Sequence, residues 1–241
     1  MNNTISEKII VALDVSDEIK ISQLLADFKG HISIVKIGKQ LFTKYGPLII
    51  HRAKEKGFTV FLDLKFHDIP NTVNHAVFET CMHAVSFLTV HTAGGSAMLK
   101  EAVRARNTAM GILSKKTLIF GVTVLTSIDQ NTLQTELSIP DSVSSIVLKR
   151  ALLAKKCELD GVIASPHEIS AIKSACGSDF LVVTPGIRPY WTQKNDQKRV
   201  MTPSEAFKEG ADFIVIGRAI TEAANPVAAM EKIVDEIESC T

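Results

Sequence analysis

The sequence lacks a dominant charge and any apolar run of membrane length. Its 27 Lys and Arg residues against 26 Asp and Glu residues give a net charge of +1, so composition offers no reason to expect nucleic-acid or membrane binding. No apolar run approaches the ~20 residues that cross a bilayer. The first residues also lack the basic region and apolar core of a signal peptide. We therefore expect a cytoplasmic protein with neither nucleic acid nor membrane as a partner.

Paired cysteines are also missing. Cys81, Cys157, Cys176 and Cys240 are scattered and form no CxxC motif, which argues against a zinc site or a disulfide framework. Hydrophobic residues make up 46% of the chain and charged residues 22%, as is typical of a soluble globular protein. No low-complexity linker or break in composition divides the chain, so we expect one domain over residues 1–241.

Eight short apolar runs recur along the chain, most of them rich in Val and Ile and without alternation. This pattern is typical of parallel strands that are buried on both faces. The runs are Ile9–Leu13, Ile32–Ile37, Phe58–Leu62, Ser86–Val90, Leu118–Leu125, Gly161–Ala164, Phe180–Val183 and Phe213–Ile216.

Segments with helical periodicity separate these runs. Residues 19–28 and 143–153 carry apolar side chains at helical spacing, and residues 226–237 form a further such segment, with Asn225 as its expected N-cap. Eight strands alternating with helices in about 250 residues predict a (β/α)₈ TIM barrel. The alternative is an open doubly wound sheet, against which no GxGxxG motif follows the first strand.

In such a barrel the active site lies at the carboxyl ends of the strands. Polar residues that directly follow the apolar runs should therefore form the site. They are Asp14, Lys36, Asp63 with Lys65, His91, Thr126 with Ser127, Ser165, residues 185–188, and Gly217 with Arg218.

The densest group of charges follows the third run. Asp63 and Lys65 are two residues apart, so both side chains point to the same side if the strand continues that far. Asp68 follows on the expected loop before Pro70. Lys36, inside an apolar run, needs a carboxylate partner, and Asp63 and Asp68 are the candidates. A structural ion pair at a strand end remains the alternative interpretation.

Two Gly-Arg arrangements follow the last two runs. Gly186 precedes Arg188 by two residues, and Gly217 directly precedes Arg218. Glycine lets the backbone approach a ligand closely, and arginine binds phosphate oxygens through two nitrogens. Because barrels often bind phosphate with these two loops, the pattern predicts a phosphate site. An isolated exposed arginine would be the alternative for either one alone.

The residue strings at these positions resemble those of the orotidine 5'-phosphate decarboxylase family. The matching strings are Asp63–Thr72, Val122–Ser127, Thr184–Arg188 and Asp212–Arg218, and the resemblance covers nearly the whole chain. It implies decarboxylation of orotidine 5'-monophosphate (OMP) to UMP without metal or cofactor. The similar barrels of magnesium-dependent sugar-phosphate decarboxylases and a non-catalytic nucleotide-binding barrel are the alternatives.

The resemblance also implies a role for individual residues. It implies a charged network of Lys36, Asp63, Lys65 and Asp68, in which Lys65 protonates C6 of the base. It implies a homodimer with shared active sites, into which Asp68 and Thr72 reach from the neighbouring subunit. The remaining expected substrate ligands are Asp14 for the ribose, Thr126, Ser127 and Pro185 for the base, and Arg188, Gln197, Gly217 and Arg218 for the phosphate.

Two histidines near these positions receive no role. His91 follows the fourth run and His67 lies between Lys65 and Asp68. Either could act as a general base. We favour a buried structural histidine with a satisfied ring for both.

Overall fold

Eight parallel strands close into a barrel, as the eight apolar runs predict. The computed structural model describes residues 3–192 and 201–239. Each strand pairs with the next, and β1 pairs with β8, so Ile9 lies opposite Ile214. The strands are β1 (Ile9–Ala12), β2 (Ile34–Gly38), β3 (Thr59–Phe66), β4 (Phe87–His91), β5 (Leu118–Val122), β6 (Gly161–Ile163), β7 (Leu181–Thr184) and β8 (Phe213–Ile216). The barrel prediction is confirmed, and an open sheet is excluded.

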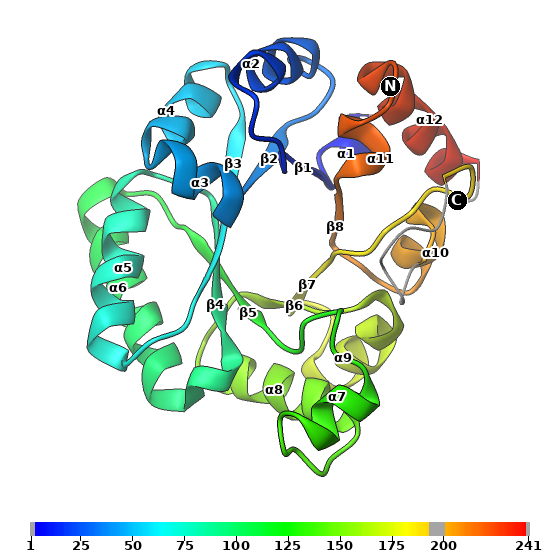
Figure 1. The fold of residues 1–241 in the computed structure, drawn as a ribbon. Helices are drawn as coiled ribbons and strands as arrows, with labels where there is room; N and C mark the ends of the chain where they lie inside the picture. Colours follow the sequence, from blue (N-terminus) through cyan, green and yellow to red (C-terminus); the bar gives the residue numbers. More distant parts are fainter. Residues whose placement is uncertain (1–2, 193–200, 240–241) are drawn as a thin grey trace.

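Helices form a ring around the outside of the barrel (Figure 1). Within the described part of the chain, none of them combines the length and apolar character needed to cross a bilayer. The α-helices are α1 (Asn3–Ser6), α2 (Glu18–Asp27), α3 (Lys39–Tyr45), α4 (Leu48–Glu55), α5 (Pro70–Met82), α6 (Gly95–Leu113), α7 (Gln130–Thr135), α8 (Val143–Lys156), α9 (Ile169–Cys176), α10 (Pro203–Lys208), α11 (Arg218–Thr221) and α12 (Pro226–Glu238), with 3₁₀ turns η1 (Thr92–Gly94) and η2 (Pro166–Glu168).

The helix ends follow local side-chain chemistry. The Asp17 side chain accepts a hydrogen bond from the backbone N–H of Lys20 and caps α2. Asn225 caps α12 in the same way through the N–H of Ala228, with Pro226 in the first turn, so the expected cap is confirmed. Asp17 and not Asp14 therefore begins α2, which leaves the Asp14 carboxylate available at the barrel mouth.

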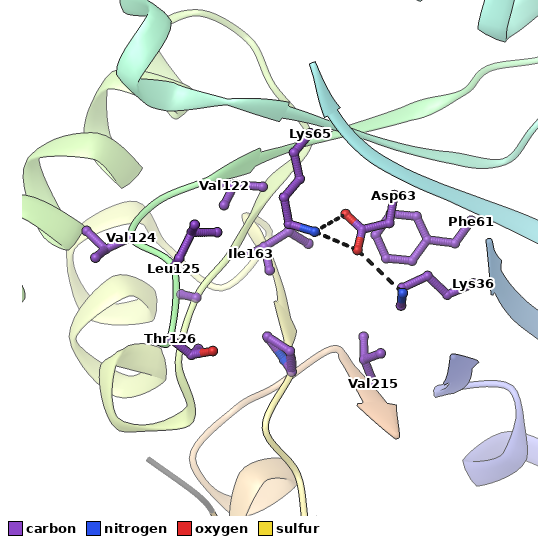
Figure 2. A pocket seen from close by; sticks show the side chains of 12 residues that line it. Lys36, Phe61, Asp63, Lys65, Val122, Val124, Leu125, Thr126, Ile163 and Val215 are labelled. Atoms are coloured by element: carbon purple, nitrogen blue, oxygen red, sulfur yellow. Dashed lines mark hydrogen bonds and ion pairs between the residues drawn. The ribbon is translucent and has the colours of Figure 1, made fainter. Parts of the chain in front are cut away.

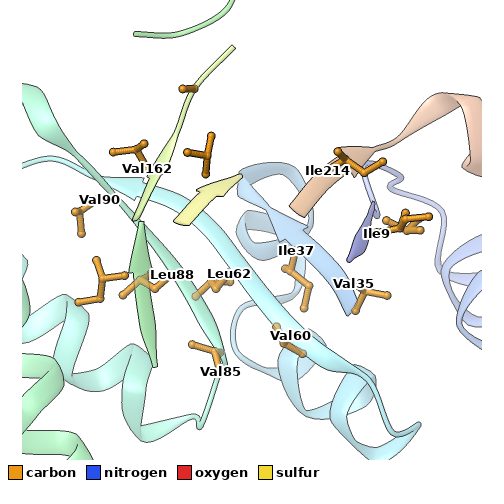
Figure 3. Packing of buried hydrophobic residues seen from close by; sticks show 14 of the residues in the cluster. Ile9, Val35, Ile37, Val60, Leu62, Val85, Leu88, Val90, Val162 and Ile214 are labelled. Carbon is orange, nitrogen blue, oxygen red and sulfur yellow. The ribbon is translucent and has the colours of Figure 1, made fainter. Parts of the chain in front are cut away.

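Apolar side chains pack in two layers on either side of the strands. The outer layer fills the space between barrel and helices, where Val35, Val60 and Leu88 lie on successive strands (Figure 3). The inner layer fills the barrel itself, where Phe61, Phe87 and Phe120 pack ring against ring. These aromatic rings fill the barrel below the polar side chains at the carboxyl ends of the strands.

Two strands end more than one residue away from the predicted positions. β5 ends at Val122 and not at Leu125, and just beyond its end the N–H and the hydroxyl of Thr123 both donate to the carbonyl of Ile163. β3 continues past Leu62 to Phe66. This extension places Asp63 and Lys65 within the strand, at the mouth of the barrel.

Candidate active site

Four side chains of alternating charge lie in a row across the ends of the first three strands. Lys36 Nζ lies 3.2 Å from Asp14 Oδ1 and 3.6 Å from Asp63 Oδ2. Lys65 Nζ lies 2.8 Å from each oxygen of Asp63. The order Asp14–Lys36–Asp63–Lys65 gives every charge an opposite neighbour. Asp63 is a partner of Lys36, as predicted, and Asp14 is a second partner that the sequence did not reveal.

Asp63 is the centre of this row. Its side chain is only 13% exposed, and burial by itself would raise the pKa of its carboxyl group. The charges of Lys36 and Lys65, together with hydrogen bonds from Lys65 and Thr89, outweigh burial and hold that pKa below its usual range. Asp63 is therefore an anion at neutral pH and faces two cations.

The backbone at Lys65 adopts an uncommon conformation. Its φ of 54° lies in the left-handed region, which costs a non-glycine residue about 1–3 kcal/mol and is concentrated at functional sites. The N–H of Lys65 donates to Thr89 Oγ1 at 2.9 Å, and the Thr89 hydroxyl donates to Asp63 Oδ1 at 2.9 Å. One residue of β4 thus contacts both members of the closest ion pair in this row of charges.

Gly38, at the end of β2, makes room for the Asp14–Lys36 pair. A Cβ atom at this position would lie 3.1 Å from Lys36 Nζ and 3.2 Å from Asp14 Oδ1, closer than side chains ordinarily pack. The absence of a side chain at residue 38 therefore lets the two charged groups meet.

An enclosed, mostly apolar cavity of about 160 Å³ lies beside Lys65 (Figure 2). The labelled side chains of Val122, Leu125 and Ile163 lie on the side of the lysine ammonium group that faces away from Asp63, whereas Val215 lies nearer Lys36. Charges act more strongly on one another in such surroundings than in water. The cavity is also lined by Lys36, Phe61, Asp63, Val124, Thr126, Ala164 and Pro185.

A second, more polar cavity of about 420 Å³ adjoins the first. Lys36, Asp63, Pro185 and Val215 line both, so the two cavities form one continuous cleft. The two Gly-Arg arrangements meet in the second cavity, as the sequence predicts. Its other lining residues are Ala12, Asp14, Gln40, Gly186, Ile187, Arg188, Gly217, Arg218 and Glu222.

Asp68 and Thr72 lie away from this row of charges. Asp68 is on the loop that leaves β3, as predicted, but its side chain is exposed and accepts a hydrogen bond from the neighbouring N–H of Ile69. Among the described residues it forms no ion pair with Lys36 or Lys65. Of the two candidate partners of Lys36, Asp63 is therefore the one that the chain itself brings to the row, because the loop carries Asp68 outward before α5 begins. Thr72 is exposed in the first turn of α5.

Some of the remaining expected site residues line the cleft and others do not. Thr126 lines the apolar cavity, whereas Ser127, in the same turn, is exposed. Ser165 is buried at the end of β6 and lines neither cavity of the cleft. Gln197 lies outside the described residues.

The two histidines stack on each other, with ring centroids 5.1 Å apart. His67 is exposed, so the expectation of a buried ring is wrong for it. His91 is half-buried, and its Nδ1 accepts a hydrogen bond from the N–H of Ala93. Burial, assisted by the nearby charges of His67, Arg150, Lys65 and Lys39, lowers the pKa of His91 to about 4. The ring is neutral at pH 7, which fits a structural histidine.

Two contributors to the site, Thr89 and Gly38, were not predicted from the sequence. Thr89 stands between Leu88 and Val90, at a position where the side chain points into the barrel, and a buried hydroxyl needs a partner. Gly38 follows a buried apolar run, two residues after Lys36. Among the described residues, no group of three or more His, Cys, Asp or Glu side chains is arranged to hold a metal ion.

Comparisons with known proteins lead to one family. The family model of "Orotidine 5'-phosphate decarboxylase / HUMPS family" matches residues 7–233. Proteins named orotidine 5'-phosphate decarboxylase are similar to the chain over nearly its full length. The one from Syntrophomonas wolfei is 47% identical over 96% of this chain and 98% of its own. The one from Moorella thermoacetica is 48% identical over 96% of this chain and 92% of its own.

Solved structures lead to the same family. The crystal structure of orotidine 5'-phosphate decarboxylase from Lactobacillus acidophilus superposes with a TM-score of 0.85 at 37% identity, covering 96% of this chain and 99% of that chain. The enzyme of that name from Pyrococcus horikoshii superposes with a TM-score of 0.74 at 26% identity, covering 95% of this chain and 99% of that chain. By its barrel, its row of charges and these matches, the chain belongs to the orotidine 5'-phosphate decarboxylase / HUMPS family.

Proposed function

We propose that this protein decarboxylates OMP to UMP in pyrimidine biosynthesis and that Lys65 donates a proton to C6. The observation that carries the proposal is the position of the Lys65 ammonium group. It lies between the Asp63 carboxylate and an apolar cavity, at the inner end of a cleft whose outer part contains two arginines. A nucleotide fits this cleft with its base inward and its phosphate outward.

The proposed reaction breaks the bond between C6 and the substrate carboxylate, which leaves as CO₂. The electron pair stays on C6, and Lys65 Nζ donates the proton that replaces CO₂, so the ammonium becomes an amine that regains its proton from solvent. A unit charge ~4 Å away contributes about 4 kcal/mol at an effective dielectric of 20. Enzymes as a class supply about 8–23 kcal/mol, so Lys65 alone is insufficient.

Asp63 and the apolar cavity support the proton donor. Asp63 keeps Lys65 charged and oriented through its two 2.8 Å contacts. A substrate carboxylate next to Asp63 brings two like charges together, and that repulsion is relieved as CO₂ departs. The apolar lining holds little water and strengthens both effects. We assign the departing CO₂ to this side of the cleft.

The outer cavity would hold the rest of the nucleotide. We assign Asp14 and Lys36 to the ribose hydroxyls. Arg188, Gly217 and Arg218, which line this cavity, are assigned to the phosphate, and Gln197 is a further proposed ligand outside the described residues. We assign Thr126, Ser127 and Pro185 to the base. Contacts to the phosphate, far from C6, raise kcat only if they bind the transition state more strongly than the bound substrate.

The enzyme is proposed to act as a homodimer with shared active sites. The exposed Asp68, which is absent from its own chain's row of charges, and the neighbouring Ile69, which is 66% exposed, favour this arrangement. If Asp68 completes the partner's site, mixing an Asp68→Ala chain with a Lys65→Ala chain restores activity. Half of the reassorted dimers are mixed and each has one intact site of two, so about a quarter of the sites recover in a symmetric dimer. Mixtures without recovered activity would contradict shared sites.

A cytoplasmic location is also proposed. Cys81, Cys157 and Cys176 are free thiols in the buried interior, which fits a reducing compartment. Fractionation of cells that contain the protein tests this directly.

The experiment that tests the function follows the loss of OMP absorbance on adding purified protein in excess EDTA. Lys65→Ala is measured in parallel. Decay with the wild type and none with the variant is the expected result. Decay only after magnesium is restored would instead favour a metal-dependent sugar-phosphate type of site. UMP binding without decay in either condition would indicate a non-catalytic nucleotide-binding barrel.

A further inference from the structure

Thr89 occupies the middle of β4 and points into the barrel. Its neighbours Leu88 and Val90 pack in the outer apolar layer, whereas Phe87, two residues before it, packs in the inner layer. Side chains alternate along a strand, so Thr89 lies on the inner side directly above Phe87. It is 0% exposed. A fully buried hydroxyl at this depth requires hydrogen-bond partners.

The pairing of β3 with β4 is irregular next to Thr89. Leu62 pairs with Leu88, but the next pair joins Phe66 to Val90. Four steps along β3 therefore match two steps along β4, and β3 holds two extra residues in this interval. Such bulges redirect side chains and are frequent beside active sites. Lys65 lies inside this bulge with its left-handed backbone.

The Thr89 hydroxyl takes the place of the missing backbone partner. A backbone N–H can only donate, so Thr89 Oγ1 must accept the 2.9 Å hydrogen bond from Lys65. Its single hydrogen is then committed to Asp63 Oδ1, also at 2.9 Å. One hydroxyl thus fixes the backbone of Lys65 and one oxygen of the Asp63 carboxylate. The Lys65 ammonium binds that same oxygen at 2.8 Å.

Other buried threonines in the barrel bind differently. The hydroxyl of Thr92 donates to the carbonyl of Val122, and that of Thr117 donates to the carbonyl of Val85. These bonds join backbone to side chain in the ordinary way for threonines between strands. Thr89 alone among these three donates to a carboxylate of the row of charges, so its position serves the site as well as the fold.

We propose that Thr89 is a positioning residue for the decarboxylation, which holds Lys65 in its bulge and orients Asp63 so that the ammonium group points at the substrate. The inference rests on the proposed role of Lys65. Thr89 does not touch substrate and acts through these two residues. Its loss therefore changes turnover, whereas it leaves the ribose and phosphate contacts in place.

Thr89→Val tests the inference because valine keeps the shape of threonine and removes the hydroxyl. A lost hydrogen bond to a charged group corresponds to roughly a 10- to 150-fold fall in kcat. We expect a fall of this size together with a UMP dissociation constant within about threefold of the wild type. Thr89→Ser, which retains the hydroxyl, should recover most of the lost kcat. Rescue of kcat by serine is a result that a purely structural role of the methyl group would not give.

Thr117→Val is the matched control. Thr117 is 2% exposed and its hydroxyl also donates one hydrogen bond, but it precedes β5 at the end of the barrel opposite the site. We expect it to lose stability and to keep the kcat of the wild type. Should Thr89→Val not fold, Thr89→Ala removes the same hydroxyl without adding bulk and carries the same expectation.

The possible results distinguish a failure of the inference about Thr89 from a failure of the proposed role of Lys65. If Lys65→Ala is inactive and folded Thr89→Val turns over OMP like the wild type, the inference about Thr89 is overturned and the role of Lys65 stands. Equal falls in kcat and UMP affinity in Thr89→Val would also overturn it, because they indicate general damage to the cleft. If Lys65→Ala keeps wild-type turnover, the proposed function of Lys65 itself fails.

Discussion

Replacing Lys36 by methionine removes the cation between two carboxylates while keeping the length of the side chain. In the native protein its Nζ lies 3.2 Å from Asp14 and 3.6 Å from Asp63, and its side chain is only 10% exposed. The charge of Lys36 is the largest of the influences that lower the pKa of Asp63. Its loss therefore raises that pKa and frees Asp14 from its partner.

The magnitude follows from the contacts that disappear. Two unit charges 3.6 Å apart attract by about 5 kcal/mol at an effective dielectric of 20, and the desolvation of Lys36 offsets much of this. A hydrogen bond to a charged group contributes about 1.5–3 kcal/mol net, so we expect kcat/KM to fall roughly 10- to 150-fold. The acid limb of the pH–rate profile should move to higher pH, because Asp63 must be ionised to orient Lys65.

Unfolding in denaturant at several pH values provides an independent measurement. A carboxyl whose folded pKa is lowered stabilises the protein above its unfolded pKa of about 3.9, and this contribution is lost as pH falls through the folded pKa. The stability difference between wild type and Lys36→Met should therefore open as pH rises through about 4 and persist at pH 7. Lys29→Met, which removes an exposed lysine at the opposite end of the barrel, is the control. A Lys36→Met enzyme with an unchanged pH–rate profile and pH-independent stability loss would refute the reasoning.

Three further changes have expected outcomes. Arg218→Ala should lower kcat/KM roughly 10- to 150-fold through lost charge-assisted hydrogen bonds to phosphate, although the residue lies far from C6; unchanged OMP kinetics would remove it from the phosphate site. Gly38→Ala should press on the Asp14–Lys36 pair and weaken UMP binding roughly three- to tenfold by calorimetry, whereas equal affinity would mean that the pair yields freely. Asn225→Ala should cost about 1 kcal/mol of unfolding free energy and leave kcat unchanged, since it removes only the cap of α12.

The barrel could be predicted because eight Val- and Ile-rich runs, typical of parallel strands buried on both faces, alternate with helical segments. The helix cap at Asn225 was equally readable, since it depends on one side chain and the backbone three residues away. Placement of the site followed from the rule that parallel strands present their carboxyl ends to one face. These features depend on local pattern, or on topology that the pattern dictates.

What could not be predicted depends on how strands pair. The two extra residues of β3 opposite β4 leave no mark in the composition of either run, so neither the left-handed backbone of Lys65 nor its bond to Thr89 was visible. The direction of Asp68 was equally hidden. It lies three positions after Lys65, but the loop between β3 and α5 turns outward, and sequence distance does not record that turn.

The barrel closes only when β8 pairs with β1, so nucleotide binding requires that the last strand has folded. Asp14 and Arg218 line one cavity, although they are 204 positions apart in the sequence. A nascent chain on the ribosome that has not yet released β8 therefore lacks part of the lining of this cavity, whatever structure its first strands have gained. Substrate or product stabilises only the barrel in which β8 has paired with β1. UMP in the cell would therefore protect newly completed barrels from proteases, whereas incomplete chains would stay unprotected.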